Sequence, residues 1–193
     1  MSQVYVRTAE GDSPVKIDEA RDHLRLHSDD DDDLVSPIIL AALDAVESYT
    51  RRDFRANTYE LLLDEFTDRI CLRRDVVDTI DGITRLVATV VTTVPTTVYY
   101  LKRGVQASEI LLQDEQTWPT DVDVREQAIV VTFTTKAHGR LESAKSAILR
   151  LVAHLYENRG DCAVITSGGT AALDVVRASG AGAILDQFRV SKV

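Results

Sequence analysis

Apolar residues recur every three or four positions in residues 15–50, which predicts two helices there. Ile17, Ala20 and Leu24 mark one face of a short amphipathic helix. Five consecutive aspartates then interrupt the pattern at positions 29–33. A second, longer apolar stripe follows the aspartates, and its residues are Leu34, Ile38, Ala41, Ala42, Ala45 and Tyr49.

The clearest helical pattern of the chain lies in residues 141–159, where one continuous apolar stripe is flanked by charged residues. Gly160 directly after it is a typical helix stop. The stripe consists of Ala144, Ile148, Leu151, Val152, Leu155 and Tyr156.

Residues 58–135 have a different pattern, with short β-branched and aromatic runs separated by Asp-Gly, Pro and Arg-Gly turns. Runs of this length and composition predict strands. We therefore expect a small antiparallel β subdomain, inserted between the second and the third helix. Its threonine-rich stretch ATVVTTVPTTVYY predicts a hairpin with Pro95 at the turn.

The last thirty residues predict a flexible helical arm. Two short apolar helical pieces, Ala171–Arg177 and Ala183–Arg189, are separated by the sequence ASGAG. The whole order of elements, helices followed by strands, a third helix and this arm, is typical of an α+β fold. No internal repeat is visible.

Composition narrows the class of protein. The chain has 193 residues, 45% of them hydrophobic, which suits one medium domain or a domain with an added subdomain. Cys71 and Cys162 lie far apart without CxxC spacing, which disfavours a zinc ribbon and a disulfide scaffold. We see no signal peptide and no apolar run of membrane-spanning length, so we expect synthesis in the cytoplasm, which the resemblance described below would make a bacterial one.

The charge distribution disfavours a nucleic-acid-gripping protein. The net charge is −9, and residues 1–66 carry 16 acidic and 7 basic side chains. Binding a phosphate backbone requires clustered lysines and arginines instead. An acidic front and a mildly basic tail would suit head-to-tail packing between copies. A generic acidic surface that aids solubility is the alternative interpretation.

A metal site is the first chemistry to consider. His23 and His27 are four residues apart, and Asp29 or Asp31 lies nearby, which is the composition of a zinc site. However, the helix should break near Ser28, and the aspartates lack the glycine of a calcium loop. A metal-binding or metal-dependent domain built on this cluster therefore stays the alternative hypothesis.

No coherent active site is visible, so we expect neither catalytic residues nor a cofactor. His154 and Glu157 are spaced for acid–base work, but no second carboxylate or nucleophile accompanies them. The glycine-rich TSGGT lacks a P-loop ending and is interpreted as a linker. Trp118 precedes Pro119 in a turn and is either a contact anchor or part of a loop packed on the β subdomain.

The aspartate run itself fits a helix start. Ser28 or one of the first aspartates would cap the long helix, and the next carboxylates would lie in its first turn, where the helix dipole favours them. One cap and one or two first-turn acids suffice for that. The surplus charge is expected to face a channel or a neighbouring subunit.

Three segments carry a recognisable pattern. Residues 15–54 read VKIDEARDHLRLHSDDDDDLVSPIILAALDAVESYTRRDF, residues 127–135 and 144–160 read QAIVVTFTT and AKSAILRLVAHLYENRG, and residues 184–190 read ILDQFRV. In this order they resemble the phage head–tail connector (adaptor) family of tailed phages and phage-like gene transfer agents. Two positions depart from the family: Arg51 stands where it usually has glycine, so the turn must form without that left-handed residue, and Phe188 stands where tyrosine is common.

The resemblance implies a structural protein and not an enzyme. Such adaptors form a ring, generally of twelve copies, beneath the portal protein of a virion or phage-like particle. The ring extends the DNA channel, through which DNA passes without specific binding, and docks a tail-side stopper or tail-terminator protein. The division implied is a connector domain in residues 1–160 and a C-terminal arm in residues 161–193. Assembly into the head–tail interface, without membrane contact, follows.

The resemblance also suggests contact residues. The portal-binding arm candidates are Ile184, Leu185, Phe188 and Arg189. The subunit-contact candidates at the end of the third helix are Glu157, Asn158 and Arg159. The channel- or subunit-facing acidic candidates are Asp29, Asp30, Asp31, Asp32 and Asp33. A small interaction module unrelated to phage is a further alternative.

Overall fold

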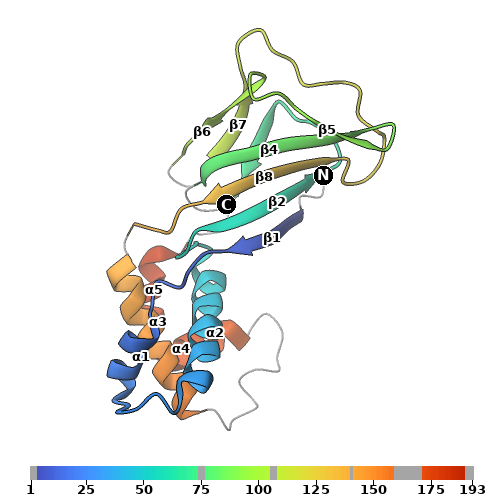
Figure 1. Ribbon diagram of the computed structural model, residues 1–193. Helices are drawn as coiled ribbons and strands as arrows, with labels where there is room; N and C mark the ends of the chain where they lie inside the picture. The colour runs from blue at the N-terminus through green and yellow to red at the C-terminus, as the bar shows by residue number, and fades with distance from the viewer. Residues whose placement is uncertain (1–3, 74–76, 105–107, 140, 159–170, 190–193) are drawn as a thin grey trace. The chain divides into compact units, whose positions relative to one another are not determined.

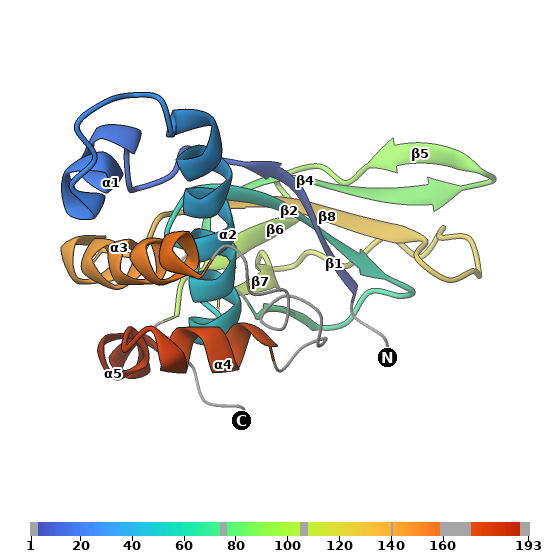
Figure 2. The same ribbon diagram turned by 90° about the horizontal axis from the view of Figure 1, so that it is seen from below.

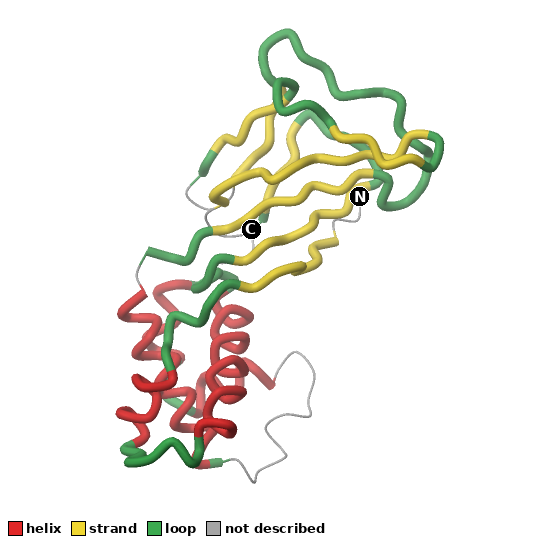
Figure 3. The backbone as a smooth tube through the Cα atoms, in the orientation of Figure 1, coloured by secondary structure: helices red, strands yellow, loops and turns green. Residues whose placement is uncertain are grey.

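The computed structural model describes residues 4–73, 77–104, 108–139, 141–158 and 171–189, and for residues 171–174 it describes the backbone alone. The chain divides into two compact units. The β unit comprises residues 1–11 and 55–137, and the helical unit comprises residues 12–54 and 138–193. Helices and strands separate cleanly between the two units (Figures 1 and 3).

The β unit contains two antiparallel sheets. A five-stranded sheet has the order β1-β2-β8-β4-β5, and a three-stranded sheet has the order β3-β7-β6. The strands are β1 (Val4–Glu10), β2 (Asn57–Leu63), β3 (Arg69–Leu72), β4 (Val77–Val87), β5 (Val90–Thr93), β6 (Tyr99–Lys102), β7 (Ser108–Leu112) and β8 (Ile129–Thr135). This confirms the prediction of an α+β protein with an antiparallel β subdomain.

The core of the β unit is formed by alternate residues of the central strands. In β2 and β8 every second side chain is buried, which is the pattern of strands that pack one face on a core. Tyr59 of β2 and Phe133 of β8 stack there at 5.7 Å between ring centres. The buried faces of both sheets contribute to one cluster that also includes Ile70 and Ile110.

One hairpin prediction was wrong. The turn between β4 and β5 is formed by Ala88 and Thr89, both with positive φ (48° and 67°), whereas Pro95 follows β5. Positive φ at both central residues matches the right-handed twist of a two-residue hairpin, although Asn-Gly is its usual sequence. The sequence ATVV carries no such dipeptide, and therefore the turn was not visible as one.

The helical unit is built from α1 (Ile17–Leu24), α2 (Asp32–Thr50), α3 (Leu141–Glu157), α4 (Ala171–Ala178), α5 (Gly182–Leu185) and a 3-10 turn, η2 (Asp186–Phe188). The helix α2 contacts α1, α3, α4 and α5, as Figure 2 shows from below. The predicted stripe of α3 lies in a common core, which includes Ile148. Of the predicted α2 stripe only Ala42 and Tyr49 are buried, whereas Leu34 and Ala41 are exposed and the buried face of α2 is centred on Val35, Ile39 and Val46.

The end of α2 resolves the departure at position 51. Arg51 adopts the left-handed conformation at φ 58° and its N–H donates to the carbonyl oxygen of Glu47 at 2.9 Å. This is the conformation for which glycine is usual at a helix end. Arg51 therefore takes the left-handed role itself, contrary to the expectation that the turn would form without a left-handed residue.

The C-terminal segment, residues 171–189, is not free in this structure. Val175, Val176, Leu185 and Phe188 are buried in the core of the helical unit. The sequence predicted an arm with a boundary after residue 160, and the structure differs because the apolar face of this segment finds its partners on α2 and α3. Residues 161–170 and 190–193 of the predicted arm lie outside the described residues.

Candidate interaction sites

The aspartate run begins at an exposed turn and ends in the first turn of α2. Asp29, Asp30 and Asp33 are exposed, and Ser28 donates a hydrogen bond to Asp30 at 2.8 Å. Asp31 occupies the N-cap position without a side-chain cap bond. An aspartate of the run therefore occupies the N-cap position, as predicted, but its side chain does not make the predicted capping hydrogen bond.

The two middle carboxylates are used to hold the helices together. The hydroxyl of Tyr156 on α3 donates to Asp31 at 2.6 Å, which diverts that carboxylate from capping. Arg21 of α1 pairs with Asp32 through two contacts of 2.8 and 3.0 Å. Two of the five aspartates therefore join α2 to its neighbours, and the exposed carboxylates of the run are the remaining three.

The C-terminal segment is fixed to the end of α2 by polar and aromatic contacts. Tyr49 donates to Asp186 at 2.5 Å, and this hydrogen bond, with burial, raises the pKa of the Tyr49 hydroxyl. Arg52 donates from Nε to the carbonyl oxygen of Phe188 at 2.7 Å. The guanidinium of Arg189 lies 5.4 Å from the centre of the Tyr49 ring, in cation–π range.

Phe188 is the centre of these contacts. Its ring meets Phe54 edge to face at 5.7 Å and His138 at 5.4 Å, and it is 2% exposed. Of the four portal-contact candidates, Leu185 and Phe188 are buried, Ile184 is half-buried and Arg189 is exposed. The structure thus brings the four together on one segment but turns two of them inward.

The candidates at the end of α3 are only partly described. Glu157 and Asn158 are exposed, and the Asn158 side chain donates to the carbonyl oxygen of His154 at 2.8 Å, which closes the helix end. Arg159 lies outside the described residues. His154 is half-buried beside the apolar stripe of α3.

The metal alternative loses its geometric basis. The helix α1 ends at Leu24, and Arg25 turns into the left-handed conformation, so His23 and His27 do not share a helical face. In the described part of the chain no three His, Cys, Asp or Glu side chains are grouped closely enough to hold a metal ion. Cys71 is a free thiol, and Cys162 lies outside the described residues.

Sequence reasoning missed two features of the sites. The strand β1 pairs with β2 at the edge of the larger sheet, although its alternation of Val4, Val6 and Thr8 is too short and too exposed to predict a strand firmly. The contacts of Tyr156 and Tyr49 with aspartates join residues more than 120 positions apart. No local pattern could have indicated such pairs.

No described helix is long and apolar enough to span a membrane. The fold combines antiparallel sheets with a helical unit whose polar contacts, at the aspartate run and the C-terminal segment, hold helices together.

Three solved structures share the fold over the whole chain. "Neck of empty GTA particle computed with C6 symmetry" has a TM-score of 0.71 and 21% identity, and the match covers 100% of this chain and 97% of that chain. "Virion of native gene transfer agent (GTA) particle" has a TM-score of 0.70 and 20% identity, and "Neck of native GTA particle computed with C12 symmetry" has 0.68 and 22%, both with the same coverage. The chain thus has the fold of a protein from such particles.

Part of the sequence also matches a family of connector proteins. Residues 14–85 match the profile of the phage gp6-like head-tail connector proteins. The matched residues run from the start of α1 into β4 and include the aspartate run and Arg51. The resemblance to head–tail connector proteins is therefore confirmed. No curated protein matches the chain.

Proposed function

We propose that this chain is a structural head–tail adaptor, which forms a ring beneath the portal of a tailed phage or phage-like particle. The observation that carries the proposal is the coincidence of two matches: the connector family over residues 14–85 and the neck fold over the entire chain. Two of the similar neck structures have C6 and C12 symmetry, which supports a ring oligomer here. In this proposal the chain is not an enzyme and carries no cofactor.

The proposal is tested by complementation of assembly. Deletion of the gene should give DNA-containing heads and separate tails, and the purified protein should restore their joining. Electron cryo-microscopy of the restored particles should then reveal a ring of this chain between portal and tail-side protein. Tails that join heads at the wild-type frequency without the protein would refute the adaptor function.

We further propose that the C-terminal segment contacts the portal. Ile184 and Arg189 are accessible on the docked segment, whereas Leu185 and Phe188 would have to leave their core first. Truncation after Ser179 would remove both buried side chains, so point variants are the cleaner test. Ile184→Asp combined with Arg189→Glu should abolish binding to portal-bearing heads. Gln187→Glu, on the same segment and exposed, is the matched control, and normal binding by the double variant would contradict the assignment.

The exposed aspartates and the end of α3 are the other proposed contact sites. We propose that Asp29, Asp30 and Asp33 face either the channel, where carboxylates repel DNA phosphates and let DNA slide, or a neighbouring subunit. Conversion of all three to asparagine should slow DNA release in the first case and impair ring formation in the second. Unchanged release and assembly would exclude both. Charge reversal at Arg159 tests the subunit contact of Glu157, Asn158 and Arg159 through ring formation.

A further inference from the structure

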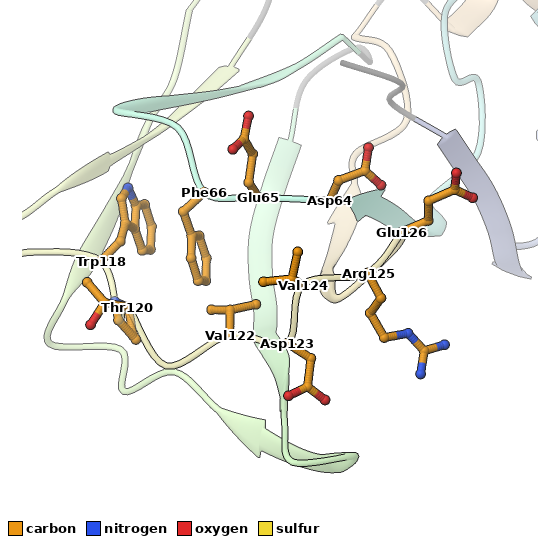
Figure 4. Close-up of a pocket in the computed structure, with 11 residues that line it drawn as sticks. Asp64, Glu65, Phe66, Trp118, Thr120, Val122, Asp123, Val124, Arg125 and Glu126 are labelled. Carbon is orange, nitrogen blue, oxygen red and sulfur yellow. The ribbon is translucent and has the colours of Figure 1, made fainter.

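An open groove lies on the β unit, between the turn after β2 and the loop that leads into β8. Its volume is about 590 Å³, and Figure 4 shows its two walls. One wall carries Glu65 and Phe66, and the other runs from Trp118 to Glu126. None of the residues that the adaptor proposal uses lies in this groove.

The aromatic side of the groove is rigid. The rings of Phe66 and Trp118 stack with 4.7 Å between centres and 2° between planes. Trp118 donates from its indole N–H to the carbonyl oxygen of Thr67 at 2.9 Å, and Tyr99 stacks on it at 6.3 Å. Side chains fixed in this way present an apolar surface without losing further conformational freedom when a ligand binds.

The opposite end of the groove is held by a carboxylate. Both oxygens of Asp123 accept hydrogen bonds, at 2.8 Å each, from the backbone N–H groups of Ala88 and Thr89. These two residues form the β4–β5 turn, and a positive φ is strained for a β-branched residue such as Thr89. Asp123 thus stabilises a strained turn, and Asp64 in turn accepts from the N–H of Gln127 at 2.9 Å.

Large apolar side chains beside this turn are left in solvent. Val124 is fully exposed, and Val90 and Val91 are 62% and 66% exposed. Single exposed valines are common on protein surfaces. Here Val124 follows Asp123 and Val90 follows Thr89, and the Asp123 carboxylate accepts a hydrogen bond from the Thr89 N–H. Val90 and Val91 are consecutive in β5 and point to opposite faces of the strand, so of the three only Val124 adds an apolar side chain to the groove lining.

The charge around the groove is strongly negative. The segments 64–68 and 113–126 contain one basic residue, Arg125, and eight acidic ones, which are Asp64, Glu65, Asp68, Asp114, Glu115, Asp121, Asp123 and Glu126. Arg85 of β4 pairs with Asp121 at 3.0 Å, and the balance of these residues remains negative. Glu65 and Glu126 are exposed and line the groove. This field attracts cationic chains and repels phosphate, so nucleic acid is the wrong ligand for this surface.

We propose that the groove binds an extended segment of a partner protein that carries lysine or arginine beside an apolar residue. The apolar side chain packs between Phe66 and Val124, and the cationic side chains pair with Glu65 and Glu126. This site goes beyond the adaptor function and does not depend on it, because the groove can be assayed on the free chain, without heads, portal or ring formation.

Tryptophan fluorescence tests the proposal directly, because Trp118 is the only tryptophan of the chain and lines the groove. The probe is the synthetic peptide acetyl-KVKLKVK-amide, titrated at low salt, with acetyl-EVELEVE-amide as its charge-reversed counterpart. The expected result is a saturable change in emission with the lysine peptide alone. The change should require at least about tenfold more peptide at 0.5 M salt, where exposed charges are screened.

Two matched variants separate a site from general charge attraction. The double variant Glu65→Lys with Glu126→Lys should lower the affinity for the lysine peptide at least about tenfold. The double variant Asp29→Lys with Asp30→Lys makes the same change in net charge on the helical unit and should change that affinity by no more than about twofold. Equal weakening by both pairs, or the absence of a saturable change, would overturn the proposal. Self-association of the free chain that the groove variant abolishes would also overturn it, since the groove would then belong to a second copy.

Discussion

Replacement of Phe188 by alanine should strongly destabilise the helical unit. Phe188 is 2% exposed and its ring contacts Phe54 and His138. Truncation of a buried phenylalanine costs about 3–5 kcal/mol of unfolding free energy, because the transfer free energy is lost and a cavity remains. With a urea m-value of about 2 kcal/mol/M, the midpoint of unfolding should fall by roughly 2 M.

The measurement is urea unfolding followed by circular dichroism at 222 nm, which reports the helices. Trp118 fluorescence reports the β unit in the same samples. Gln187→Ala is the matched control, because Gln187 lies in the same 3-10 turn and is exposed, so its replacement should change the free energy by less than about 0.5 kcal/mol. A loss below about 1 kcal/mol for Phe188→Ala would refute the docked position and support a free arm in the unassembled chain.

Three further predictions concern single contacts. Tyr156→Phe removes the hydroxyl bound to Asp31 and should lower the unfolding free energy by about 1–2 kcal/mol in urea titrations; no change would show the bond to be irrelevant. Arg51→Gly should raise it by up to about 1 kcal/mol, because the left-handed conformation strains a residue with a Cβ, and a fall would contradict that strain. Glu10 has a pKa held below its ordinary value of 4.5, mainly by the hydrogen bond from Arg7. Its stabilisation should therefore be present above pH 4.5 and lost as pH falls through the lower folded value. Glu10→Gln should destabilise slightly at pH 7, and this difference should shrink as pH is lowered below 4.5; a difference that stays constant with pH would contradict this.

The sequence predicted the elements of this fold better than their partners. Helical spacing is a property of neighbouring residues, and the stripes on 15–50 and 141–159 accordingly became α1, α2 and α3. The strands of 58–135 followed in the same way from their alternation. In contrast, the strand β1 depends on pairing with β2, some fifty residues away, and its own exposed side chains give little indication of it.

In the candidate sites, too, the sequence predicted local features but not contacts between distant residues. The aspartate run was correctly interpreted as a helix start, because Asp32 and Asp33 lie in the first turn of α2, where the helix dipole favours carboxylates. That Asp31 would bind Tyr156 and Asp32 would bind Arg21 depended on how three helices pack, and the run alone does not contain that information. The resemblance to connector proteins linked segments that are far apart in the sequence, because a family pattern includes residues that meet only in the folded protein.

The C-terminal segment shows why an amphipathic piece cannot be assigned a partner from its own sequence. The apolar face that predicts insertion into a groove of the portal also fits a groove of the helical unit, where Leu185 and Phe188 now lie. A portal that takes up these two side chains must outweigh their burial in the free chain, since a ligand shifts an equilibrium only by its differential affinity for the two states. If docking of Phe188 alone is worth about 3–5 kcal/mol, less than 1% of the free chain is undocked before assembly. In the proposed portal contact, Leu185 and Phe188 would therefore become available only after the segment undocks, whereas Arg189 is exposed and Ile184 half-buried on the docked segment.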